Sequence, residues 1–109
     1  MVTITVYKNS GQEYTAFRCL GHTGYAPAGE DIVCAAVSVL VINTINSIET
    51  LVSDRFDIET DPDSGLIGFS LQEGYSKESL LLIRSLVLGL QGIQKSYGTE
   101  YIRLTFEEV

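Results

Sequence analysis

The feature that most constrains the fold is an uncharged, strongly apolar run at residues 32–48, which is 17 residues long. A transmembrane helix needs about 20 mostly apolar residues. This run is shorter, and it contains five polar side chains: Ser38, Asn43, Thr44, Asn46 and Ser47. It is therefore predicted to be a buried helix, extending from about residue 31 to residue 52. Other parts of the fold must cover such a helix.

Segments on both sides of this helix alternate in the way that half-buried β-strands do. Val2, Ile4 and Val6 alternate with Thr and Tyr side chains near the N-terminus. The sequence DPDSG at residues 61–65 is a strong turn signal between two further strands. The predicted strands cover residues 2–7, 13–20, 55–60, 66–71 and 101–106.

A second helix is predicted between Ser76 and Gly98. Ser76 is a suitable N-cap because its hydroxyl can accept from an N–H of the first turn, and Gly98 is a suitable C-cap. The resulting order is ββαββαβ, which predicts a two-layer α+β fold with a mainly antiparallel sheet. The chain has 109 residues and no visible linker, so residues 1–109 are predicted to form a single domain.

The apolar side chains of the first helix nearly encircle its axis, and the second helix is similarly apolar. A two-layer fold covers only one side of a helix, so the other side is predicted to contact a second copy of the chain in a homodimer. The alternative is a wide apolar face in a monomer.

Charge limits the classes of partner. The chain has 14 acidic and 7 basic residues, for a formal net charge of −7. Nucleic acid is a poor partner, because phosphates require clustered Lys and Arg. A basic peptide suits this charge, although acidity can also serve solubility alone. Residues 1–10 show no export signal, so we expect a cytoplasmic protein without membrane contact, and reduced cysteines.

The segment GHTGYAPAGEDIVCAAVS, residues 21–38, contains the only histidine and one of the two cysteines. Asp31 is the predicted N-cap of the first helix, which places Cys34 in the first turn, where unpaired N–H groups and the helix dipole favour a thiolate. His22 is the only histidine available as its base. The intervening loop is rich in small residues that let it fold back, and its glycines are Gly21, Gly24 and Gly29.

Two other interpretations of these residues remain open. Cys34 can be a small buried hydrophobe, with His22 an ordinary loop residue. Cys19, His22 and Cys34 also have the chemistry of zinc ligands, although a structural zinc site needs a fourth ligand. Cys19 itself lies in a predicted strand and is expected to pack there. A disulfide between the two cysteines would be unusual in the cytoplasm.

The same segment resembles the signature of the bacterial ribosomal-processing cysteine proteases, the Prp family. That signature contains Gly-His-small-Gly, then Gly-x-Asp, two aliphatic residues, Cys, small residues and Ser. Thr23 stands where the family usually has Ala. The chain length and the ββαββαβ order also fit. The matching residues are Gly21, His22, Thr23, Gly24, Gly29, Asp31, Ile32, Val33, Cys34, Ala35, Ala36 and Ser38.

The resemblance implies a cysteine endopeptidase that acts in ribosome assembly. Such an enzyme removes the N-terminal extension of a large-subunit ribosomal protein, number twenty-seven, after a hydrophobic, Phe-containing motif. Cys34 would be the nucleophile and His22 the proton acceptor and donor, in a homodimer that needs no cofactor. First-turn N–H groups would form an oxyanion hole. Asp31 would orient His22 or only cap the helix, and Ser38 would bond within the site or to its own helix.

A function of another class also fits the sequence. The chain can be a non-enzymatic homodimeric module that binds ribosomal or other protein surfaces, with an incidental His–Cys pair. Thiol reactivity separates the two hypotheses. An active Cys34 reacts with alkylating agents well below about pH 8, whereas a buried structural thiol does not.

Overall fold

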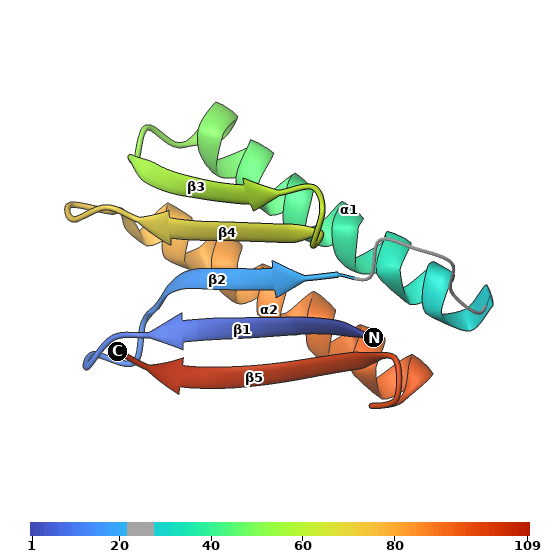
Figure 1. The fold of residues 1–109 in the computed structure, drawn as a ribbon. Helices are drawn as coiled ribbons and strands as arrows, with labels where there is room; N and C mark the ends of the chain where they lie inside the picture. The colour runs from blue at the N-terminus through green and yellow to red at the C-terminus, as the bar shows by residue number, and fades with distance from the viewer. Residues whose placement is uncertain (22–27) are drawn as a thin grey trace.

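The structure, a computed structural model, describes residues 1–21 and 28–109, and only the backbone of residues 28–31. The elements follow the predicted order ββαββαβ (Figure 1). In chain order they are β1 (Val2–Lys8), β2 (Tyr14–Leu20), α1 (Ala28–Leu51), β3 (Phe56–Asp61), β4 (Leu66–Leu71), α2 (Lys77–Tyr97) and β5 (Ile102–Glu108).

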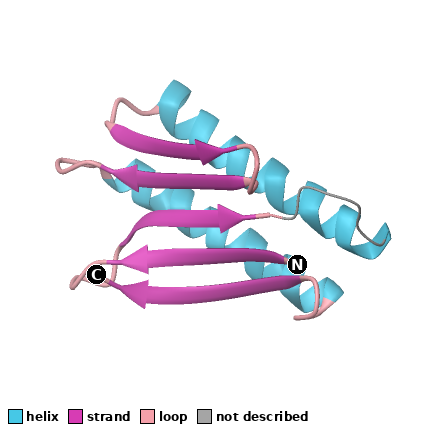
Figure 2. Cartoon of the chain, viewed as in Figure 1, coloured by secondary structure: helices cyan, strands magenta, loops and turns pink. Residues whose placement is uncertain are grey.

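The described strands form one five-stranded sheet in the order β3-β4-β2-β1-β5. Neighbouring strands are antiparallel, except that β1 and β5 are parallel. The hairpin β3–β4 therefore pairs with β2 through β4, although α1 separates β2 from this hairpin in the sequence. β3 is an edge strand. Both helices lie on the same face of the sheet (Figure 2). This arrangement confirms the predicted α+β fold with a mainly antiparallel sheet.

Alternation along the strands builds the core between the sheet and the helices. Val2, Ile4 and Val6 are at most 1% exposed, while the residues between them are partly exposed. On the same face of the sheet, the rings of Phe17 in β2 and Phe69 in β4 stack with their centroids 5.0 Å apart. Burying each such side chain stabilises the fold by about 1.5–3 kcal/mol, which makes this face the main source of stability.

α1 packs one side into this core. Its buried positions recur at helical spacing and are Val33, Val37, Val41, Thr44 and Ile48. The polar member, Thr44, is satisfied because its hydroxyl donates to the carbonyl of Leu40 at 2.8 Å. Ile32–Leu51 is long and apolar enough to span a membrane by length and composition alone, with a mean hydropathy of 1.8. One side of this helix is therefore part of the core, and the predicted buried helix is confirmed for that side only, because most of the segment is not buried.

The start of α1 differs from the prediction. The helix begins at Ala28, so Asp31 is not its N-cap, and Gly29 lies in the helix rather than in the loop. Ala is the strongest helix former and an acidic residue is favoured in the first turn, where Glu30 lies, so the helix extends by about one turn. Cys34 becomes the seventh helical residue. It is therefore in the second turn, and its predicted place among the unpaired first-turn N–H groups is wrong.

α2 begins and ends where the sequence predicted, with Ser76 as the N-cap and Gly98 as the C-cap. Asp54, in the segment between α1 and β3, secures its start. The Oδ2 atom of Asp54 accepts the N–H and the hydroxyl of Ser76, both at 2.7 Å, and the hydroxyl of Ser79 at 2.6 Å. These hydrogen bonds hold the pKa of Asp54 below its usual value. The bond from Ser79 has the largest effect, and the two bonds from Ser76 add to it.

Replacing Asp54 by Asn should lower the free energy of unfolding at pH 7 more than at pH 3. The pKa of Asp54 is lowered in the folded state. Its charge therefore stabilises the fold above the unfolded-state pKa of about 3.9, and this contribution disappears as the pH falls through the folded pKa. Urea unfolding of the wild type and of Asp54→Asn at the two pH values measures the difference.

Asp57→Asn is the matched control, because that exposed carboxylate accepts only a side-chain bond of 3.2 Å from Gln72. We expect it to change stability little at either pH. An equal loss for Asp54→Asn at pH 3 and pH 7 would show that its charge does not secure α2.

Candidate active site

A cleft of about 320 Å³ lies between the β3–β4 hairpin and the first half of α1. α1 contributes Cys34 and Ser38 to one wall, beside Gly21 at the end of β2. The turn end of the hairpin forms the other wall. The full lining is Gly21, Cys34, Ser38, Thr60, Asp61, Pro62, Gly65, Leu66 and Ile67. The cleft therefore exposes a thiol and a hydroxyl between α1 and the hairpin.

The pairing of β2 with β4 brings Gly21 into this cleft. Leu20 pairs with Leu66, and the N–H of Gly21 donates to the carbonyl of Gly65 at 3.3 Å. A Cβ atom on Gly21 would lie 3.8 Å from Sγ of Cys34 and 3.9 Å from the oxygen of Gly65. The backbone at Gly21 thus passes directly beside the thiol. A larger side chain here would occupy the cleft.

The two cysteines have different environments, and both are thiols rather than a disulfide. Cys34 is half-buried and lines the cleft. Cys19 lies two residues before Gly21 in β2, points into the core and is only 6% exposed. Burial and, to a smaller extent, the charge of the Cys34 thiolate raise the pKa of Cys19 to about 11. Cys19 therefore packs as predicted, and Cys34 is the cysteine that a molecule in the cleft can reach.

Ser38 follows Cys34 by one helical turn, and both side chains line the same cleft, as their spacing predicted. The backbone of Asp31 and Gly29 belongs to the first turn of α1. His22, Thr23 and Gly24 lie outside the described residues. His22 is also one of the three ligands of the zinc alternative. Among the described residues, no group of three or more His, Cys, Asp or Glu side chains is arranged to hold a metal ion.

The hairpin wall of the cleft is not apparent from the sequence. Residues 61–65 predict only a turn, although Asp61, Pro62 and Gly65 line the same cleft as the thiol. The turn is locally fixed, because Oδ1 of Asp61 accepts the N–H of Asp63 at 3.1 Å and Gly65 has a φ of 71°. The local sequence does predict this turn. Its position beside α1 depends on β2 pairing with β4 across the sheet.

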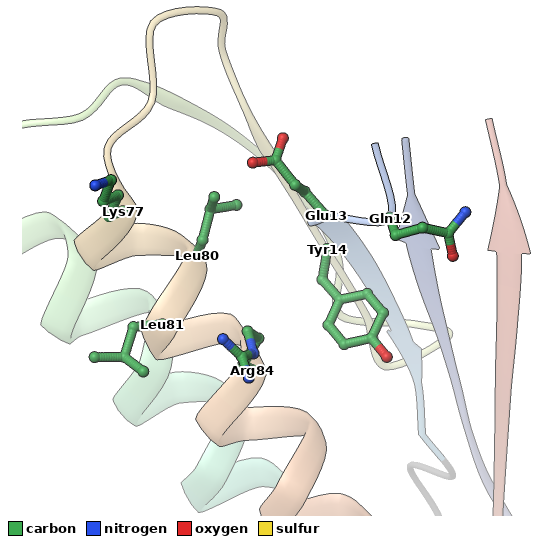
Figure 3. Close-up of a pocket in the computed structure, with 7 residues that line it drawn as sticks. All are labelled: Gln12, Glu13, Tyr14, Lys77, Leu80, Leu81 and Arg84. Carbon is green, nitrogen blue, oxygen red and sulfur yellow. The ribbon is translucent and has the colours of Figure 1, made fainter. Parts of the chain in front are cut away.

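A second and larger cavity, of about 640 Å³, lies at the other end of β2 (Figure 3). It is open between the start of β2 and the first turns of α2. Its lining is Gln12, Glu13, Tyr14, Lys77, Leu80, Leu81 and Arg84. None of these side chains is a nucleophile with a neighbouring base. The smaller cleft, which contains Cys34, is therefore the candidate active site.

Iodoacetamide at about pH 8 should modify Cys34 and leave Cys19 intact. With a pKa of about 11, roughly one Cys19 thiol in a thousand is ionised at that pH, and burial also blocks access. Peptide mapping by mass spectrometry after brief labelling measures the extent of modification at each cysteine. Labelling of the protein unfolded in urea is the control in which both thiols are accessible. Equal modification of the two cysteines in the folded protein would contradict these environments.

The chain is similar to known proteins over most of its length. The family described as Cysteine protease Prp matches residues 1–103. The Ribosomal processing cysteine protease Prp of Staphylococcus aureus is 30% identical over 107 residues, which are 98% of this chain and 100% of that protein. The Bacillus subtilis protein of the same name is 26% identical over 101 residues, which are 89% of this chain and 90% of that protein.

Solved structures show the same likeness. The S. aureus protease Prp in complex with a substrate peptide has a TM-score of 0.90 at 29% identity, covering 97% of this chain and 99% of that one. The same protease with a covalently linked product peptide has a TM-score of 0.86 at 30% identity, with the same coverage. Since the family match extends over almost the whole sequence, this chain belongs to the cysteine protease Prp family.

Proposed function

We propose that Cys34 is the nucleophile of peptide hydrolysis and that His22 is its acid–base partner. The observation that carries the proposal is the half-buried Cys34 thiol in a cleft beside Gly21, at the end of β2. His22 is covalently bonded to Gly21 and is the only histidine in the chain. A thiol needs such a base or cationic partner to become an effective nucleophile.

Hydrolysis then consists of two acyl transfers. The Cys34 thiolate attacks the scissile carbonyl carbon, and the C–N bond breaks as the His22 imidazolium donates its proton to the leaving amine. Neutral His22 next takes a proton from water, and the resulting hydroxide attacks the thioester. The C–S bond breaks, the acid product leaves, and the thiolate and imidazolium are restored. Both steps use only water and side chains of this chain.

Asp31 and Ser38 have supporting roles in this proposal. Because α1 begins at Ala28, Asp31 is no longer needed as an N-cap, and orienting His22 is the role that remains of the two considered. Ser38 lines the same cleft as Cys34, so its hydroxyl is placed to donate to a bound peptide. The first-turn N–H groups lie about one turn from Cys34, so the oxyanion hole expected there is not retained.

The proposed substrate is the N-terminal extension of a large-subunit ribosomal protein, number twenty-seven. The relatives are named ribosomal processing proteases, and one was solved with a substrate peptide. A net charge of −7 favours encounter with a basic ribosomal protein. We place this reaction in the cytoplasm, without a membrane or nucleic-acid partner and without a cofactor.

Cys34→Ala should abolish cleavage of a peptide that spans this extension, whereas Cys19→Ala should retain it. Cys19 is the matched control because it is the only other thiol and is buried away from the cleft. Mass spectrometry of the products locates the cut, and circular dichroism confirms that both variants fold. Wild-type cleavage by Cys34→Ala would overturn the assignment. Binding of an uncut peptide by the wild type would instead support the non-enzymatic module.

We also propose that the active protein is a homodimer. α1 exposes Val39 at 67% and Ile42 at 47%, and α2 exposes Leu81 at 62% and Leu88 at 71%. These side chains lie on the helix faces directed away from the sheet, where a second copy can cover them. Sedimentation equilibrium at micromolar concentration should give twice the chain mass of 11.9 kDa. A monomer would contradict this proposal and leave the protease assignment intact.

A further inference from the structure

The free edge of β3 leads into the candidate active site. The sheet order places β3 at one edge and β5 at the other (Figure 1). Thr60 and Asp61, at the end of β3, line the Cys34 cleft, whereas no residue of β5 does. A peptide lying along β3 would therefore run into the cleft. An exposed strand edge is also a ready template for pairing with an extended chain.

The hydrogen-bond pattern shows which groups of β3 face this edge. The N–H of Gln72 donates to the carbonyl of Arg55 at 2.9 Å, one position before the Phe56–Leu71 pair. In an antiparallel ladder, residues exchanging such bonds alternate with residues whose N–H and C=O point away from the partner strand. Because the β3–β4 register has no shift, the outward groups belong to Phe56, Ile58 and Thr60.

The side chains of β3 divide between the two faces of the sheet. Ile58 pairs with the core residue Phe69 and so lies on the helix face, yet it is 44% exposed, because no strand lies beyond it. Asp57 and Glu59 lie on the open face. Of the described residues, Arg18 is the one that pairs with this face, with its guanidinium 3.6 Å from Glu59. The edge therefore offers an apolar surface on one face and excess negative charge on the other.

We propose that an extended segment of the peptide substrate pairs with the free edge of β3 as an additional strand. Its alternate side chains then lie beside Ile58 on the helix face and beside Asp57 and Glu59 on the open face. The preferred segment therefore alternates apolar and basic residues, with its scissile bond at the Thr60 end, next to Cys34. This inference rests on the proposed peptidase function and adds how the substrate is held and selected.

The test removes one outward N–H from each edge of the sheet. Ile58→Pro deletes an N–H that faces the free edge of β3, a position where an edge strand tolerates proline. Glu108→Pro is the control on β5: the N–H of Val109 donates to Lys8, so the N–H of Glu108 faces outward. We expect kcat/KM for the peptide of the ribosomal-protein extension to fall roughly tenfold or more in Ile58→Pro and to change less than about twofold in Glu108→Pro. Alkylation of Cys34 should be unchanged in both, which shows that the cleft is intact.

Equal kcat/KM values for the two proline variants would overturn the proposal that the peptide pairs with β3. If kcat/KM falls and the dimer also dissociates to a monomer, the β3 edge contacts a second copy of the chain rather than the peptide. That result would also overturn the proposal. If Ile58→Pro does not fold, the test is cleavage by the wild type of peptides that are N-methylated at one successive position each. Loss of cleavage at every second position supports the added strand, and loss without alternation contradicts it. Failure of the wild type to cut any peptide defeats the proposed function instead.

Discussion

The candidate site depends on the pairing of β2 with β4. These strands are distant in the sequence, yet their register places Leu20 opposite Leu66 and lets Gly21 bond to Gly65. The stacked rings of Phe17 and Phe69 favour that register, because a slip of one residue would move the ring of the slipping strand to the open face and break the stack. With the register fixed, the hairpin turn faces α1, and the Cys34 thiol lies in a cleft rather than on an open helix.

The same strand also explains why the two thiols differ. Along β2, Cys19 points into the core, and two residues later Gly21 presents bare backbone to Cys34. Burial raises the pKa of Cys19 to about 11 and keeps it protonated, while Cys34 remains accessible from the cleft. The two cysteines thus differ in exposure, one packed in the core and the other lining the cleft. Glycine at position 21 leaves the space beside the sulfur open, since an added Cβ would lie in ordinary contact with Sγ, at 3.8 Å.

Local sequence patterns predicted most of the fold. Alternation located the strands, the uncharged run located α1, and the caps Ser76 and Gly98 bounded α2. The spacing of Cys34 and Ser38 placed both on one helix face, which the cleft confirms. The start of α1 was missed because Asp31 is a strong N-cap signal, while Ala28 and Glu30 favour an earlier start. The hairpin wall was missed because no local pattern specifies which strands become neighbours.

The central claim is that Cys34 forms a covalent acyl intermediate with its peptide substrate. The most direct measurement is intact-protein mass spectrometry, after the wild type has been mixed with the peptide of the ribosomal-protein extension and quenched with acid. The account predicts a transient adduct that adds the mass of the N-terminal cleavage fragment less one water, mapped to Cys34, released by hydroxylamine and missing in Cys34→Ala. Cleavage that proceeds without any adduct, or an adduct mapped to Cys19, would contradict it.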